Sequence, residues 1–513
     1  MKKDFILILD FESQYSHMIA RRIRDVGVYT LLYHYNDISI SHIISKKPKG
    51  LILSGGPYSV YEKNSPLISK KFFQMNIPIF GICYGMQLIS FLFGGEIKKS
   101  KYKEYGKSNF IIDHLNHSLF HGIPDQSIVW MSHFDEVKNI PTEFQVIGHT
   151  SSCHIAAMSH ISKDIYAVQF HPEVKNTEYG VSMLKNFVFH ICKCNSNWKL
   201  NHFVQKTIND IKQRVNKKKV LLGFSGGIDS FVTAYIIHKA IGNSLSCIFV
   251  DTGLLLKNEK EKIFFLCQKM NFDIKIIDAK NRFLSKLIGI VDPEKKRKVI
   301  GEEFFSIFQE ESKKIENVEF IAQGTIYSDV IESSVYLKKN SIKSHHNVGG
   351  LPKELKKFKL IEPLKELFKD EVREIGEKLG ISKEILYRHP FPGPGFGIRI
   401  IGEINEKKIS ILKEAENILS QELKNYDIYN SVSQAFIVLL PVKSVGIKGD
   451  KRSYEYAAIL RVMNTEDFMT ATFSHLSYDF LEKVSNRITN EVDGINRIAY
   501  DITSKPPSTI EWE

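Results

Sequence analysis

Residues 77–93 read Ile-Pro-Ile-Phe-Gly-Ile-Cys-Tyr-Gly-Met-Gln-Leu-Ile-Ser-Phe-Leu-Phe, and this stretch decides the fold class. Its first part is a short apolar run that ends at Gly81, which is typical of a buried strand, whereas Met86–Phe93 has the length and composition of a helix. The same order of short run and helix opens the chain, at Phe5–Leu9 and Ser16–Val26. Short strands that alternate with helices predict an open, mostly parallel sheet with helices on both faces.

The turn inside this stretch, Gly81-Ile-Cys83-Tyr-Gly85, has the form of a nucleophile elbow with cysteine in place of serine. A helix that starts there favours the thiolate, because its N-terminus carries positive potential. Downstream, Gln169-Phe-His171-Pro-Glu173 offers an imidazole and a carboxylate that can orient it. Ser54-Gly55-Gly56-Pro57 ends another predicted strand and is suited to bind an oxyanion through backbone N–H groups. For Cys83 or His171 taken singly, a buried core residue is the simpler interpretation. The three motifs together predict a Cys–His–Glu site.

A second strand–turn–helix unit follows a polar stretch, Lys193–Lys199, which predicts a linker. Val220–Phe224 predicts a strand and Phe231–Ile241 a helix, and Ser225-Gly-Gly-Ile-Asp229-Ser230 lies between them. Consecutive small residues at a helix N-terminus expose N–H groups that can bind phosphates, although a purely structural glycine turn is the simpler alternative. The loop lacks the Gly-Lys-Ser/Thr of the Walker pattern. Asp229 could supply an oxygen ligand to Mg²⁺ on the phosphates.

The composition changes near residue 388, where Arg388–Gly397 holds too much proline and glycine for a helix or strand. Beyond it, Leu412, Ala415, Leu419 and Leu423 have helical spacing, and two strand-like runs follow at 432–442 and 456–462. The predicted architecture is therefore two open parallel-sheet α/β domains followed by a small α+β domain. We place the limits of the three domains at 1–195, 196–388 and 389–513.

The composition of the 513-residue chain narrows the class of protein. Hydrophobic residues make up 43% and charged residues 25%, which excludes a largely disordered or fibrous chain. The net charge of +12 permits a nucleic-acid partner, but no basic stretch is interleaved with aromatics as in RNA-binding modules, and we expect none. No apolar run approaches the ~20 residues of a membrane span, and we expect no membrane partner. Six scattered cysteines predict neither a disulfide framework nor a zinc site, which fits a cytoplasmic location.

The motifs of the first block resemble the class I glutamine amidotransferase family. They are Ser54–Pro57, Gly81–Gln87 and His171–Glu173. The resemblance implies that Cys83 attacks the side-chain amide of glutamine, that His171 protonates the departing ammonia, and that the thioester is hydrolysed to glutamate. It also implies oxyanion- and glutamine-contacting residues, namely Gly55, Gly56, Tyr84, Gln87, Ser132, His133 and Asp135.

The glycine-rich loop of the second block resembles the pyrophosphate-binding loop of ATP pyrophosphatases, which form adenylyl intermediates. The implied ATP contacts are Ser225, Gly226, Gly227, Ile228, Asp229, Ser230, Phe231, Val250 and Gly253. A chain with an ammonia-producing site and an adenylating site is expected to aminate an acceptor that ATP has activated.

Longer motifs extend the resemblance from end to end, to the glutamine-hydrolysing GMP synthetase family. They are Pro293–Lys298, Gly324–Ser333, Lys343–Pro352, Glu362–Asp370, Arg388–Gly397 and Lys505–Glu513. The family implies amination of XMP to GMP with glutamine, ATP and Mg²⁺, no zinc, haem or flavin, and a homodimer formed through the C-terminal domain. The implied XMP contacts are Arg297, Arg497, Lys505 and Glu511, and the implied lid and adenylation residues are Asp329, Glu332, Lys343, His345, His346 and Lys369.

Three departures from the family pattern leave alternatives open. Glu12 stands where glycine is usual, Phe231 stands where a small hydroxyl residue is common, and Ser334–Lys343 is shorter and less glycine-rich than the usual lid. One alternative is another ammonia-using adenylating enzyme similar to NAD⁺ synthetase, against which Arg297 and Lys505–Glu513 argue. Another is a nucleotide-binding scaffold that has lost catalysis, against which the intact Cys–His–Glu set argues.

Overall fold

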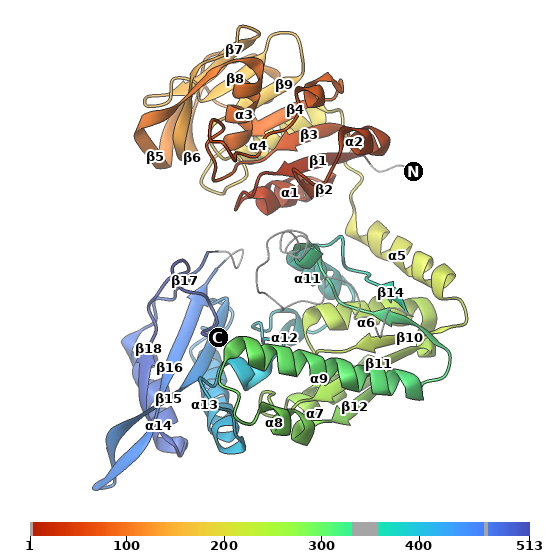
Figure 1. The fold of residues 1–513 in the computed structure, drawn as a ribbon, viewed down its shortest axis with the longest axis vertical. Helices are drawn as coiled ribbons and strands as arrows, with labels where there is room; N and C mark the ends of the chain where they lie inside the picture. Colours follow the sequence, from red (N-terminus) through yellow and green to blue (C-terminus); the bar gives the residue numbers. More distant parts are fainter. Residues whose placement is uncertain (1–3, 331–357, 466–469) are drawn as a thin grey trace. The chain divides into compact units, whose positions relative to one another are not determined.

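The computed structural model describes residues 4–330, 358–465 and 470–513, and its contacts divide the chain into two compact units. The first unit is Met1–Phe203 and the second is Val204–Glu513 (Figure 1). No helix in the described ranges is long and apolar enough to cross a membrane. All six cysteines are buried free thiols.

The first unit is built on a nine-stranded sheet of order β2-β1-β3-β4-β9-β8-β7-β5-β6. Five strands form the predicted parallel part: β1 (Phe5–Asp10), β2 (Tyr29–His34), β3 (Gly50–Leu53), β4 (Ile79–Ile82) and β9 (Ile165–Val168). Four strands extend it in antiparallel fashion: β5 (Glu96–Ile112), β6 (Gln126–Asn139), β7 (Phe144–Thr150) and β8 (Ala157–His160). The sequence prediction did not include this antiparallel half. Buried and less buried residues alternate along most of β6, as expected for a strand with one face on the core.

Helices cover the sheet of the first unit. They are α1 (Ser16–Asp25), α2 (Ile40–Lys46), α3 (Tyr84–Phe93) and α4 (Gly180–Lys185), with short turns of other helix types at Lys70–Gln74, Ser118–Phe120 and Asn186–Ile191. Alternate residues along a strand, Leu7 and Leu9 of β1 and likewise Leu51 and Leu53 of β3, share one hydrophobic core with Met86 of α3. This period of two is what a sheet with two covered faces requires. The packing fixes the start of α3, and with it Cys83, against the parallel strands.

The predicted linker Lys193–Lys199 forms neither helix nor strand, but its end is anchored on the first unit. Trp198 is buried, and its ring lies 4.8 Å from that of Tyr29. The backbone N–H of Trp198 donates to the carbonyl of Gly27. The guanidinium of Arg24 lies 5.2 Å from the Trp198 ring, a cation–π contact. The next helix, α5 (Leu200–Val215), begins directly after this anchor.

The second unit contains a five-stranded parallel sheet of order β12-β11-β10-β13-β14. Its strands are β10 (Lys219–Gly223), β11 (Leu245–Asp251), β12 (Ile274–Asp278), β13 (Val318–Ala322) and β14 (Lys359–Ile361). Its helices are α6 (Ile228–Ile241), α7 (Glu259–Lys269), α8 (Lys280–Leu287), α9 (Pro293–Lys314), α11 (Lys369–Lys378) and α12 (Lys383–Leu386). The order of the strands reverses at β10, so the loop that follows β10 lies where ligands bind in such sheets.

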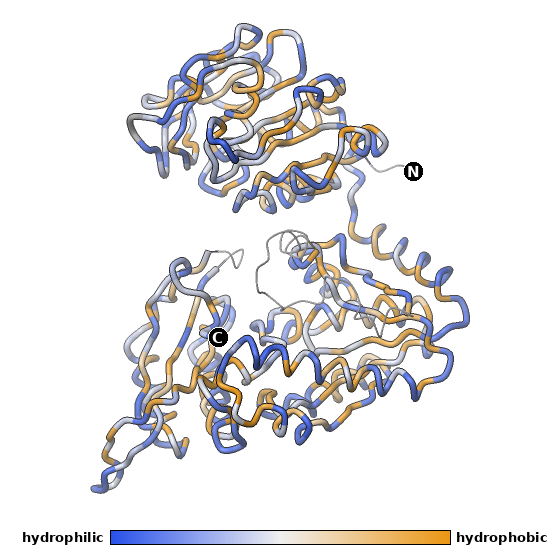
Figure 2. Tube along the Cα trace, viewed as in Figure 1, coloured by the Kyte–Doolittle hydropathy of each residue, from blue (hydrophilic) through white to orange (hydrophobic). Residues whose placement is uncertain are grey.

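A smaller α+β part completes the second unit. It has the strands β15 (Gln434–Lys448), β16 (Lys451–Asn464), β17 (Thr472–Phe473) and β18 (Ile495–Tyr500), with α13 (Glu406–Asn425) and α14 (Tyr478–Glu491). Leu412, Ala415, Leu419 and Leu423 are all buried on α13, and they belong to one core that also includes strands of the parallel sheet. Figure 2 shows hydrophobic residues along the strands and hydrophilic ones on outer helices such as α9. The predicted limits at 195 and 388 stay interpretations of the sequence.

Candidate active sites

Cys83 occupies a strained turn between β4 and α3. Its φ is 52° and its ψ is −106°, a backbone conformation that residues other than glycine rarely adopt. The flanking glycines are needed for close packing: a Cβ on Gly81 would lie 2.7 Å from the carbonyl oxygen of Gly85, and a Cβ on Gly85 would lie 2.3 Å from that of Leu53. The glycine spacing therefore lets the turn press against β3 and presents Cys83 at the carboxyl edge of the sheet.

His171 and Glu173 lie at the end of β9, which pairs with β4. His171 Nδ1 is 2.7 Å from Glu173 Oε1, and both side chains are buried. Burial lowers the pKa of His171, but the Glu173 carboxylate and the Cys83 sulfur outweigh it and raise this pKa to about 10. An imidazole that is held in this way favours its protonated form beside a thiolate.

The predicted oxyanion turn lies beside both groups. A Cβ on Gly55 would be 3.2 Å from His171 Cε1 and 3.6 Å from the Cβ of Cys83. As the first residue of α3, Tyr84 has a backbone N–H without an intrahelical acceptor. Its side chain is buried, its hydroxyl donates to the carbonyl of Pro66 at 2.7 Å, and its ring packs against the turn at Gly56, where a Cβ would lie 3.4 Å from Tyr84 Cγ.

The predicted glutamine-contacting residues form one hydrogen-bond network that reaches the sulfur. Gln87 Nε2 donates to the Asp135 carbonyl at 2.9 Å and lies 3.3 Å from Gln169 Oε1. Gln169 Nε2 lies 3.6 Å from Cys83 Sγ, and the Ser132 carbonyl lies 3.7 Å from it. His133 Nδ1 is 3.0 Å from the same Asp135 carbonyl. The structure thus brings Gln87, Ser132, His133 and Asp135 to one side of Cys83.

Three residues of this network were missed by the sequence analysis. Glu104 Oε2 lies 3.4 Å from Nε2 of His133, and the Tyr61 hydroxyl donates to Asp135 Oδ1 at 2.8 Å. Gln169 stands two positions before His171, and that closeness was an available signal. Glu104 comes from the unpredicted strand β5 and Tyr61 from a segment without helix or strand, so the sequence carried no comparable signal for them.

The turn after β1 keeps its left-handed conformation although Glu12 replaces the usual glycine. Glu12 has a φ of 65°. Its carboxylate accepts a hydrogen bond from the Tyr58 hydroxyl and lies 3.6 Å from His34 Nε2. Burial, together with Glu12, raises the pKa of Tyr58 to about 12. The side chain that replaces glycine is thus held next to the turn that carries Gly55 and Gly56.

We expect Glu173→Gln to lower the pKa of His171 toward its ordinary value of about 6.5, because the variant removes the main charge that raises it. A raised pKa in the folded state stabilises the protein fully below about pH 6.5, and this contribution fades as the pH rises through about 10. The difference in unfolding free energy between wild type and variant, measured in urea titrations, should therefore shrink with rising pH. In a separate assay, the rate of glutamine hydrolysis by the variant should be about 10²–10⁴-fold lower than that of wild type. A difference that is constant from pH 6 to 10 would contradict the assignment.

The phosphate loop joins β10 to α6. Gly226 has a φ of 76°, and a Cβ there would lie 2.3 Å from Ile263 Cδ1. The Gly227 N–H lies 3.3 Å from Ser225 Oγ, and the Ser230 hydroxyl donates to the Gly227 carbonyl at 2.8 Å. The first N–H groups of the 14-residue α6 have no intrahelical acceptor. This arrangement offers an anion several backbone donors and a positive helix end.

Asp229, the second residue of α6, forms an ion pair with Lys369. Its Oδ2 lies 2.5 Å from Lys369 Nζ, whereas its Oδ1 is buried and has no hydrogen-bond partner among the described residues. A Cβ on Gly324, just after β13, would lie 3.0 Å from the Asp229 backbone. The described ranges hold no cluster of three or more His, Cys, Asp or Glu side chains that could bind a metal alone. One free carboxylate oxygen fits Mg²⁺, which takes most of its other ligands from water and substrate phosphates.

Other predicted ATP contacts are placed around this loop. Phe231 is fully buried, with its ring 4.7 Å from that of Phe224, so its side chain belongs to the core and not to the loop surface. Ile228 and Val250 are also buried. Gly253 has a φ of 77° after β11, and its N–H donates to Asp251 Oδ1 at 3.0 Å. Of these residues, Gly253 lies in a turn at the carboxyl end of the strand next to β10.

The predicted XMP contacts fall into two groups. Arg297 on α9 donates to the carbonyl of Glu513, and Glu511 accepts from Arg399 at 2.9 Å. Lys505 shares the same final segment. Arg497 is exposed on β18 and has a different neighbour, Ser444 Oγ at 3.3 Å.

The predicted lid is described only at its edges. Asp329 Oδ2 accepts from the Ile326 N–H at 3.0 Å, and Lys369 begins α11. The other predictions, including the shortened stretch, lie outside the described residues; they are Glu332, Lys343, His345, His346 and the range 334–343.

Three family models match the chain in the order that the motifs predict. "Glutamine amidotransferase class-I" matches residues 7–191, "NAD synthase" matches residues 199–298, and "GMP synthase C terminal domain" matches residues 421–512. The first match contains Cys83 and His171, and the second contains the phosphate loop.

Relatives with the same name are similar over their whole length. GMP synthase [glutamine-hydrolyzing] of Fusobacterium nucleatum is 57% identical over 100% of both chains. The proteins of that name from Borreliella burgdorferi and Caldicellulosiruptor saccharolyticus are 52% and 50% identical, again over 100% of both chains. This chain therefore belongs to the glutamine-hydrolysing GMP synthase family.

Proposed function

We propose that this chain makes GMP from XMP, with glutamine as the nitrogen donor and ATP as the activating substrate. The observation that carries the proposal is the presence of two candidate sites of different chemistry in one chain. A buried Cys–His–Glu set lies in the first unit, and a phosphate loop with a free carboxylate oxygen lies in the second. Relatives similar over their full length, and named for this reaction, support the same substrates.

In the first unit, Cys83 Sγ attacks the side-chain carbonyl carbon of glutamine. The backbone N–H groups of the Gly55–Gly56 turn and of Tyr84 stabilise the oxyanion. His171 gives its proton to the departing nitrogen, which leaves as ammonia, and then takes a proton from the water that hydrolyses the thioester. Glutamate is released and Cys83 is restored. Glu173 keeps the imidazole oriented throughout.

In the second unit, O2 of XMP attacks the α-phosphorus of ATP, and pyrophosphate leaves into the N–H groups of residues 225–230. Ammonia then adds to C2 of the adenylyl-XMP, and AMP departs with the former O2 of XMP. Asp229 Oδ1 would hold Mg²⁺, which neutralises charge on the phosphates when bound. Lys369, paired with Asp229, adds a positive charge at the same place. Arg297, Arg497 and Lys505 supply cations suited to the XMP phosphate.

The C-terminal part further supports a homodimer. Val442, Val445, Ile447 and Tyr454 on the β15–β16 hairpin are 59%, 60%, 77% and 66% exposed. An exposed apolar patch of this kind is typical of a surface that a second copy covers. Six free thiols fit a reducing compartment, and we place the protein in the cytoplasm.

The test follows the ultraviolet absorbance of XMP with ATP and Mg²⁺, in separate reactions with glutamine and with an ammonium salt. Conversion with both donors is the expected result. Conversion with ammonium alone would remove the glutamine-dependent part of the proposal. No conversion with either donor, from a folded protein, would favour another acceptor or a non-catalytic nucleotide-binding scaffold.

A further inference from the structure

Arg461 is the largest side chain that is fully buried in the described part of the chain. It lies on β16, the strand that pairs with β15, β17 and β18, and it is 0% exposed. Within the described ranges, the carboxylate that contacts it is that of Asp501, with Oδ2 at 3.0 Å. A buried guanidinium must satisfy its remaining donors or destabilise the fold. The partners of those donors therefore indicate what the residue holds in place.

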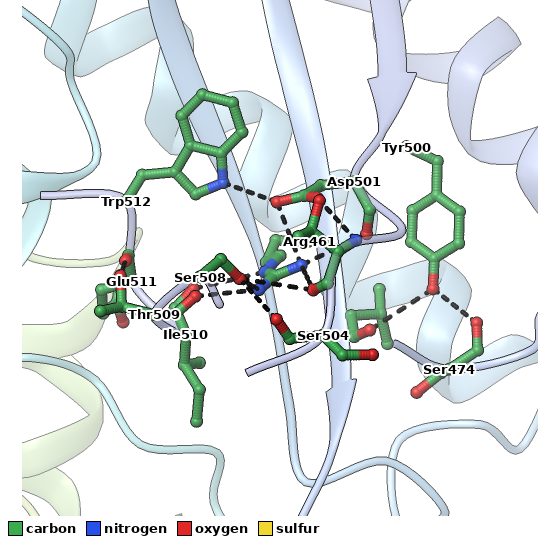
Figure 3. Close-up of polar contacts among 12 residues, drawn as sticks. Arg461, Ser474, Tyr500, Asp501, Ser504, Ser508, Thr509, Ile510, Glu511 and Trp512 are labelled. Atoms are coloured by element: carbon green, nitrogen blue, oxygen red, sulfur yellow. Dashed lines mark hydrogen bonds and ion pairs between the residues drawn. The ribbon is translucent and has the colours of Figure 1, made fainter. Parts of the chain in front are cut away.

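The other donors of Arg461 all reach one segment, residues 501–510 (Figure 3). The acceptors are the carbonyl oxygens of Asp501 (3.5 Å), Thr503 (2.6 Å), Thr509 (2.9 Å) and Ile510 (3.4 Å) and the Ser508 hydroxyl (2.9 Å). They lie on both sides of residues 504–507, so the planar guanidinium joins the start of this segment to its end. Trp512 Nε1 closes the arrangement by donating to Asp501 Oδ2 at 3.0 Å.

This segment has little regular structure of its own. After β18 it forms no helix or strand. Its backbone is joined to its surroundings by an isolated bridge between Lys505 and Ala471 and by the Asp501 N–H, which donates to the Leu460 carbonyl of β16 at 3.0 Å, and Ile510 packs in a small core with Phe436 and Ile459. Two of the residues that the family resemblance implies as XMP contacts, Lys505 and Glu511, lie within it or next to it. A segment with few backbone hydrogen bonds depends on side-chain contacts for a single conformation.

We infer that Arg461 is a positioning residue that holds the segment 501–511 in the conformation that presents Lys505 and Glu511 to XMP. The inference rests on the proposed function for the identity of the ligand. Arg461 acts through the segment, since its acceptors are four carbonyls, one hydroxyl and the Asp501 carboxylate, all of that segment. Arginine is required because lysine offers three donors from one point and cannot join the two sides of a loop in one plane.

The first test is Arg461→Lys in the full chain. We expect hydrogen–deuterium exchange in residues 501–513 to become faster, with exchange in the first unit unchanged. We expect the KM for XMP to rise about tenfold or more, since several hydrogen bonds to a charged group are lost. The KM for ATP and the basal hydrolysis of glutamine should change by less than about twofold, because they depend on other residues, the phosphate loop at 225–230 and the Cys83 site of the first unit. The matched control is Arg487→Lys on α14, where Arg487 also pairs with carboxylates, Glu422 and Glu491, but is partly exposed. It should leave all of these values unchanged.

The two readouts separate the possible failures. Unchanged exchange in the segment overturns the inference whatever the activity, and so does a wild-type KM for XMP in a variant whose segment exchanges faster. If wild type itself does not convert XMP, the proposed function fails and the assignment of the ligand fails with it. If Arg461→Lys does not fold, Ser508→Ala decides, because it removes one acceptor and adds no charge. We expect about a threefold rise in its KM for XMP, and no rise would overturn the inference.

Discussion

Cys83→Ala is expected to abolish GMP formation from glutamine and to leave GMP formation from ammonium salts near the wild-type rate. The loss with glutamine should be at least about 10⁴-fold, because the variant removes the nucleophile and not a supporting group. The ammonium-dependent rate should survive because Cys83 and its network belong to the first unit, whereas the phosphate loop and the predicted XMP contacts belong to the second. The measurement is the rate of XMP conversion with each donor.

The matched control for this prediction is Cys153→Ala. Cys153 is also buried in the first unit, but its sulfur lies 3.4 Å from the Ile155 carbonyl, and burial raises its pKa to about 12. The control should keep both activities. Loss of both activities in a folded Cys83→Ala would mean that the two chemistries are not separate, and retained use of glutamine would mean that Cys83 is not the nucleophile.

Asp229→Asn should have the opposite effect to Cys83→Ala: it should impair GMP formation with either nitrogen donor and spare glutamine hydrolysis. It should lower GMP formation from both donors by at least about 10²-fold, because it removes the carboxylate that we propose as the Mg²⁺ ligand. Hydrolysis of glutamine, measured without ATP and XMP, should be unchanged. The fold should tolerate the variant, since Lys369 is 38% exposed and remains hydrated without its partner.

A control for Asp229→Asn is Glu319→Gln. Glu319 also pairs with lysines, at 2.5 Å from Lys359 and 3.5 Å from Lys218, but lies on β13 away from the loop. This ion pair at the surface should contribute little to the stability of the fold, so GMP formation by Glu319→Gln should stay near the wild-type rate with both donors. If Asp229→Asn kept full activity with both donors, the carboxylate would have no role at the phosphates.

The parallel strands and the turns after them could be predicted because their signals are local. Each catalytic or phosphate-binding turn follows a short apolar run directly, so a few adjacent residues define both the element and the chemistry. The Cys83 turn and the Ser225–Ser230 loop are examples, and the structure places both at carboxyl ends of strands. The residue roles within these sites stay predictions, which the variants above address.

The parts that were not predicted depend on contacts between distant residues. The antiparallel half of the first sheet pairs strands such as β5 and β7, whose register is set by tertiary packing. Glu104 reaches His133 through this half. Arg461 has partners 40–49 positions further along the chain, and a single arginine in an apolar strand carries no signal of where its donors point. The burial of the Phe231 side chain was not predicted either: α6 turns that position toward Phe224, and the ring packs in the core.

The most direct test of the central claim is the mass of the GMP that is formed from XMP, ATP and glutamine labelled with ¹⁵N in its side-chain amide. We expect the GMP to carry the label, and we expect AMP, pyrophosphate and glutamate to form in equal amounts with it. Glutamate and labelled ammonia without labelled GMP, from a protein that binds ATP and XMP, would contradict the claim that this one chain joins the two chemistries.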